Sequence, residues 1–71
     1  MEITYDKDAD AVYIEFRKGE FAKNKKMDDF TILDLDDKGN ILGIELLRVS
    51  ERLPAESLSE VHVKNLLVTA Q

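Results

Sequence analysis

The segments YDKDADAVYIEF (residues 5–16) and LDDKGNILGIEL (residues 35–46) decide how this chain can fold, because they align without a gap at an offset of thirty residues. Three positions are identical in that alignment: Asp6 and Asp36, Ile14 and Ile44, Glu15 and Glu45. Each segment has an apolar run, a polar turn and a second apolar run. In the first segment, apolar and polar residues alternate after the turn, which is typical of a half-buried strand. The sequence therefore predicts two similar β-hairpins, over about residues 2–17 and 30–47.

The C-terminal third predicts one short helix and one more strand. Pro54 suits the first position of a helix, and we expect that helix over residues 54–59. Beyond it Val61 and Val63 alternate with polar residues, and β-branched side chains fit a pleated sheet. We expect a strand over about residues 61–68, with a helix there as the open alternative. The predicted fold is an α+β domain over residues 1–71, built on an antiparallel sheet.

Length and composition limit the classes of protein that fit. A chain of 71 residues makes one small domain with a thin core, which oligomerisation can supplement. There is no cysteine for a disulfide or a thiolate metal site. The chain has no signal-peptide pattern and no apolar run long enough to cross a membrane, so we expect a cytoplasmic location. The net charge of −5 argues against nucleic acid as a partner.

Half of the basic residues lie in a ten-residue stretch that contains only one acid. The sequence predicts a charged connecting loop over residues 17–27, because these lysines have no aromatic neighbours beyond Phe21 for reading nucleic acid. A basic loop on an acidic body could also meet an acidic partner. The basic residues are Arg17, Lys18, Lys23, Lys25 and Lys26.

Residues 34–45 resemble a calcium-binding EF-hand loop in part. Acids stand at positions 1, 3 and 12 and a glycine at position 6 of that loop, but Lys38 stands where a fifth-position oxygen ligand is needed. Both flanks are predicted strands rather than helices. We therefore expect no EF-hand site, and a weak divalent-metal or small-ligand site in the acidic turns is the alternative function. Its candidate residues are Glu15, Asp34, Asp36 and Glu45.

Glu15 and Glu45 are equivalent in the alignment and could approach each other if the hairpins pack about a pseudo-twofold axis. Two close carboxylates push their pKa values apart and can act as acid and base. We expect solvated or salt-bridged side chains instead, because such a catalytic pair needs a cleft that so short a chain rarely forms. His62 is the single histidine, and no nucleophile motif or phosphate loop is present. The sequence predicts no enzyme activity, no metal centre and no cofactor.

Residues 41–47, ILGIELL, are apolar on both faces of the predicted strand, so both faces need to be covered. Gly43 weakens the strand and marks a close approach by another group. Its equivalent in the alignment is Tyr13, whose ring is a candidate to lie over it. We expect a homo-oligomer, most simply a dimer, that acts as a protein-interaction module. The candidate interface residues are Tyr13, Ile41, Gly43 and Leu47.

Three patterns together resemble a family of small prokaryotic domains of unknown function, DUF2283. They are Y-D-x-x-A-D-A-x-Y-I over residues 5–14, D-x-D-x-x-G-x-x-x-G-I-E over residues 34–45, and L-x-x-S over residues 47–50. The resemblance covers about residues 3–53. It implies no known activity and no catalytic residues. Some members look like partners in toxin–antitoxin gene pairs, so the resemblance implies an antitoxin-like role with a basic protein partner.

Overall fold

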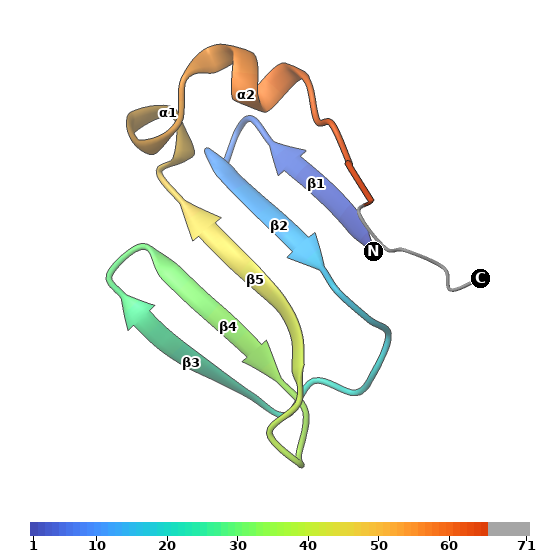
Figure 1. The fold of residues 1–71 in the computed structure, drawn as a ribbon. Helices are drawn as coiled ribbons and strands as arrows, with labels where there is room; N and C mark the ends of the chain where they lie inside the picture. The colour runs from blue at the N-terminus through green and yellow to red at the C-terminus, as the bar shows by residue number, and fades with distance from the viewer. Residues whose placement is uncertain (66–71) are drawn as a thin grey trace, which may run out of the picture.

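A computed structural model of the chain describes residues 1–65. It shows a five-stranded antiparallel sheet with strand order β1-β2-β5-β4-β3, followed by two short helices (Figure 1). None of the described helices is long and apolar enough to cross a membrane. The elements are β1 (Glu2–Asp6), β2 (Ala11–Glu15), β3 (Lys23–Asp28), β4 (Thr31–Leu35), β5 (Ile41–Leu47), α1 (Val49–Arg52) and α2 (Ala55–Ser59).

The α+β class and the antiparallel sheet expected from the sequence are confirmed. β1 pairs with β2, and β4 pairs with β5, inside the two ranges expected for the hairpins. β2 and β5 then pair with each other in the sheet interior, and Ile14 lies directly opposite its alignment equivalent Ile44. That the two hairpins are copies of one repeated unit stays a prediction.

Three of the turns between strands begin with an aspartate that accepts a hydrogen bond from a backbone N–H two residues later. Asp6 Oδ1 accepts from the N–H of Asp8 at 3.0 Å. Asp28 and Asp36 do the same toward residues 30 and 38, at 2.8 and 2.9 Å. Short polar side chains that bond to their own backbone favour turns over strands. Asp36, at position 3 of the segment that partly resembled a calcium loop, therefore has a structural role in its turn.

The prediction of a loop over residues 17–27 is wrong for the second half of this range. Residues 23–28 form the edge strand β3, which pairs with β4. Its sequence KNKKMD lacks the alternation of apolar and polar residues that indicates a strand. Edge strands often carry lysines, since these charges hinder pairing with other chains. The register with β4 therefore holds β3 in the sheet, although its own composition does not predict a strand.

The C-terminal part also differs from the expectation. A helix is present close to the expected range, at Ala55–Ser59, but it is preceded by a second one, Val49–Arg52. Residues 61–65 form no strand, and residues 66–68 of the expected strand lie outside the described part of the chain. The residues around Val61 and Val63 instead form an extended segment that runs beside β1 (Figure 1).

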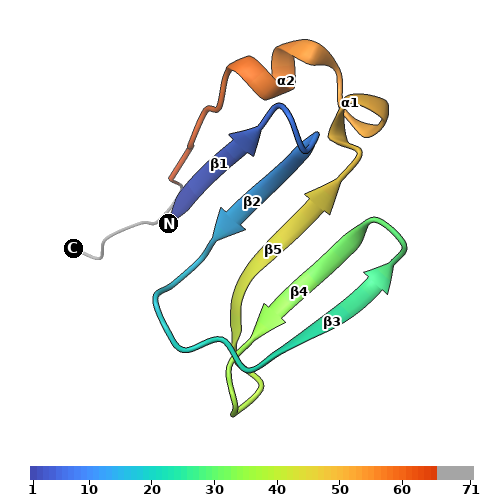
Figure 2. The same ribbon diagram turned by 180° about the vertical axis from the view of Figure 1, so that it is seen from behind.

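Alternation along the strands gives the sheet two chemically different faces. The first, here called the apolar face, has no helix across its centre, because both helices lie at one end of the strands (Figure 2). Leu58 of α2 reaches the edge of this face beside Ile3 and Tyr5. Only four apolar side chains in the described residues are buried, so the core is thin: Val12, Leu35, Leu42 and Val49. The apolar face consists of Ile3, Tyr5, Val12, Ile14, Leu33, Leu35, Leu42, Ile44 and Leu46.

The opposite face, here called the acidic face, collects most of the sheet's carboxylates. Register places Glu15 beside Glu2 on one side and Gly43 on the other, while Tyr13 lies opposite Glu45. The residues of this face that surround the carboxylates are Glu2, Thr4, Asp6, Ala11, Tyr13, Glu15, Asp34, Gly43 and Glu45.

Candidate functional site

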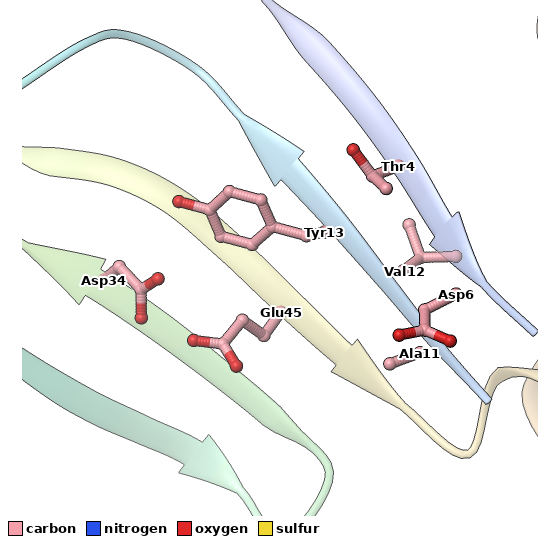
Figure 3. A pocket seen from close by; sticks show the side chains of 7 residues that line it. All are labelled: Thr4, Asp6, Ala11, Val12, Tyr13, Asp34 and Glu45. Atoms are coloured by element: carbon pink, nitrogen blue, oxygen red, sulfur yellow. The ribbon is translucent and has the colours of Figure 1, made fainter. Parts of the chain in front are cut away.

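The candidate site lies on the acidic face, where three adjacent strands bring three side chains together. β2 supplies Tyr13, β5 supplies Glu45 and β4 supplies Asp34. Figure 3 shows the Tyr13 ring reaching across β5, with the carboxylates of Asp34 and Glu45 beside each other. All three residues lie in paired strands, so the register of the sheet, including the bulge next to Asp34, sets their spacing.

Gly43 is what allows this arrangement. A Cβ atom at Gly43 would lie 2.6 Å from Cζ of Tyr13 and 2.6 Å from the backbone oxygen of Ile14. The tyrosine ring therefore occupies the space that a side chain would need, as expected from the alignment of Tyr13 with Gly43. The glycine is required here by the close approach of another group.

Asp34 and Glu45 form a hydrogen-bonded carboxyl pair. The hydrogen bond with Asp34, together with burial and the negative charge of Asp34, raises the pKa of Glu45 to about 7. Two carboxylates cannot share a hydrogen bond unless one is protonated, and the like charge opposes ionisation of both. Near neutral pH the pair therefore takes up or releases one proton, and it is Glu45 whose pKa lies in this range.

Asp34 also accepts hydrogen bonds from its other neighbours. The side-chain amide of Asn24 on β3 donates to Oδ1 of Asp34 at 3.4 Å. Burial, then the charge of Asp34 and that of Glu15, raise the pKa of the Tyr13 hydroxyl, which also donates to Asp34. These donors place the Asp34 carboxylate at the centre of the cluster.

A shallow depression of about 380 Å³ lies over this cluster (Figure 3). It is open to solvent, and Thr4 and Asp6 on β1 form its far side. Such a surface can hold a proton near neutral pH and attract a cation. The residues lining it are Thr4, Asp6, Ala11, Val12, Tyr13, Asp34 and Glu45.

The structure brings only part of the expected acidic set together. Glu15 lies on the same face, but opposite Gly43, and it forms an ion pair with Lys18 at 3.2 Å. Asp36 is not part of this cluster. In the β4–β5 turn its carboxylate accepts hydrogen bonds from the backbone N–H and the side-chain amide of Asn40, at 2.8 and 3.0 Å. Within residues 1–65 no group of three or more histidine or acidic side chains is arranged to hold a metal ion.

Three of the four candidate interface residues lie on the acidic face. Tyr13 and Gly43 contact each other there, and Leu47 is half-buried opposite Ala11. Ile41, at the start of β5, is exposed. Their role as an interface stays a prediction.

The sequence did not identify Asp34 as the partner of Glu45. Equivalence in the alignment suggested Glu15 instead, but the ring of Tyr13 and the bare Gly43 lie between these two glutamates. The register of the β4–β5 hairpin places Asp34 opposite Gly43, and thus diagonal to Glu45. Counting outward from the DDKGN turn would have suggested this pair, although the bulge next to Asp34 makes such a count uncertain by one residue.

The fold and the site define a small single-sheet α+β domain with one apolar and one acidic face. A family model described as a protein of unknown function, DUF2283, matches residues 2–50, and the chain belongs to this family. This confirms the resemblance that the sequence patterns indicated. No curated protein and no solved structure matches the chain.

Proposed function

We propose that this protein is a self-associating interaction module without a catalytic activity of its own. The observation that carries the proposal is the apolar face of the sheet, which is buried at Val12, Leu35 and Leu42 but open to solvent along β1. Ile3 and Tyr5 of β1 are 42% and 38% exposed, and Phe16, which directly follows β2, is 41% exposed. Monomeric proteins rarely leave a continuous apolar patch of this kind in water.

The acidic face supports a second contact, with a protein partner that carries a basic surface. An antitoxin-like role is the special case in which that partner is a basic toxin, as the family resemblance implies. Complementary charge raises the association rate and selects partners. The cytoplasmic location expected from the sequence stays a prediction.

Self-association predicts that the melting temperature depends on protein concentration. If folding and assembly are coupled, mass action stabilises the folded state as the concentration rises. For a domain of this size, each tenfold increase should raise the melting temperature by about 3–5 °C. Differential scanning fluorimetry between micromolar and millimolar protein measures this directly. A melting temperature that is constant over that range would contradict the proposal.

A second candidate function is weak binding of a divalent cation or a small cationic ligand, and the paired carboxyl groups of Asp34 and Glu45 favour it. When both are ionised they repel each other, and a bound cation would relieve that repulsion. Only two carboxylates meet directly here, so we expect low affinity at most.

This candidate predicts that millimolar magnesium, calcium or manganese raises the melting temperature more at pH 8 than at pH 6. At pH 6 the proton on Glu45 competes with the cation, because the pKa of Glu45 is about 7. Asp34→Asn removes one of the two ligands and should abolish the effect, whereas Asp37→Asn in the exposed turn should leave it unchanged. The absence of any shift at pH 8 would exclude the candidate.

A further inference from the structure

We infer that two copies of this chain pack face to face through their apolar faces and form a symmetric dimer. The inference rests on the proposed self-association and adds which surface is used and what covers it. Two sheets packed in this way lie about 10 Å apart and make a β-sandwich, which is a common way to bury one face of each.

The apolar face is continuous across the whole sheet. One register row runs from Ile3 through Ile14, Ile44 and Leu33 to Lys25, and therefore crosses all five strands. It contains no acidic side chain, and its single charge lies on the edge strand. An apolar centre with a charged rim is typical of the interfaces of homodimers.

A neighbouring row continues the same surface. It joins Tyr5, Val12, Leu46 and Thr31, and its single charge, Asp28, again lies on the edge strand β3. A groove of about 560 Å³ extends the face past β1, between that strand and the segment that follows α2. Its lining is mostly apolar and consists of Met1, Ile3, Tyr5, Leu58, Val61 and Val63.

The exposed area is larger than a monomer of this mass should have. A folded monomer of 8.1 kDa exposes about 4,500 Å². This chain exposes 5810 Å². The surplus of about 1,300 Å² is shared between the sheet and the exposed segment around Val61 and Val63, and the roughly 800 Å² that each partner buries in a typical stable interface lies within it. The flat shape, 44 × 33 × 18 Å, agrees with one layer of a two-layer structure.

Charge favours a second copy as the occupant of this surface. Face-to-face packing leaves both acidic faces on the outside, so the net charge of −5 on each copy does not oppose association at close range.

Two adjacent residues of β1 provide a matched test, because Ile3 and Thr4 are both exposed and point to opposite faces. Ile3→Lys places an ammonium group in the proposed interface and should raise the dimer dissociation constant at least about a hundredfold, as a buried unpaired charge does. Thr4→Lys adds the same charge on the acidic face and should leave the dimer intact. Circular dichroism shows whether each variant is folded.

The wild-type chain contains a second, independent probe. It has two tyrosines, Tyr5 on the apolar face and Tyr13 on the acidic face. Nitration followed by mass spectrometry should show that Tyr5 becomes protected as the protein concentration rises, while the reactivity of Tyr13 does not change. This readout holds even if Ile3→Lys fails to fold.

The outcomes separate the two proposals. A wild-type chain that is monomeric at every concentration overturns self-association itself. A wild-type dimer in which Tyr13 rather than Tyr5 is protected, and which Leu47→Asp dissociates but Ile3→Lys does not, keeps self-association and overturns the apolar face as its interface.

Discussion

Gly43→Ala should destabilise this protein more than a methyl group added at either of its other two glycines. The new Cβ atom would lie 2.6 Å from the backbone oxygen of Ile14, which cannot move without breaking the β2–β5 pairing. It would also displace the ring of Tyr13. Overpacking against a fixed group costs about 2–4 kcal/mol, so we expect the melting temperature to fall by at least about 10 °C.

Gly19→Ala is the matched control for this prediction. A Cβ atom at Gly19 would come equally close to another atom, at 2.6 Å, but that atom is the terminal methyl group Cδ2 of Leu42. The end of a flexible side chain can turn away, so we expect a loss of less than about 1 kcal/mol. Urea unfolding of both variants gives the comparison. Equal stabilities for the two variants would show that Gly43 is not constrained by its neighbours.

Glu45→Gln should stabilise the protein above neutral pH and remove part of its pH dependence. The folded state raises the pKa of Glu45 to about 7 from an ordinary value of 4.5. The folded state thus holds a proton that the unfolded chain releases, so the wild type loses stability as the pH rises from about 4.5 to 7. With allowance for partial exposure of the pair, this loss is about 2 kcal/mol.

The glutamine variant keeps a hydrogen-bond donor to Asp34 and has no proton to lose. Its stability should equal that of the wild type near pH 4.5 and exceed it by about 2 kcal/mol at pH 8. Asp28 and Asp36 do not obscure this window. Hydrogen bonds from Phe30 and from Asn40, respectively, lower their pKa values, so their contribution is present above pH 4 and lost only in stronger acid.

Glu15→Gln controls for the removal of one negative charge from the same face. Glu15 does not belong to the carboxyl pair, and its ion pair with the exposed Lys18 contributes little. We expect its stability to follow the wild type within about 0.5 kcal/mol at every pH. A Glu45→Gln variant that is less stable than the wild type at pH 8 would show that the ionised pair is not a source of strain.

The parts of the fold that could be predicted are those where local sequence and tertiary context agree. Alternation in β2 and the aspartate turns both identify their elements correctly. β3 could not be predicted, because KNKKMD has neither alternation nor β-branched residues and depends on its pairing with β4. At Val61 and Val63 a strand was predicted where none forms, because their alternation belongs to an extended segment beside β1.

The candidate site was predicted only in part, for a related reason. Tyr13 and Gly43 were matched by their alignment, and their contact follows from the register of β2 with β5. The Asp34–Glu45 pair depends on how β4 pairs with β5, including the bulge at Asp34. The apolar face was not identified as the candidate interface, because the sequence does not show that both helices lie at one end of the strands.

The mass of the protein in solution tests the central claim most directly. Light scattering after size exclusion, over a concentration series, should give twice the 8.1 kDa mass of the chain at high concentration and a decline toward 8.1 kDa on dilution. A constant mass of 8.1 kDa at all concentrations would contradict the claim that the exposed sheet face is an interface between two copies.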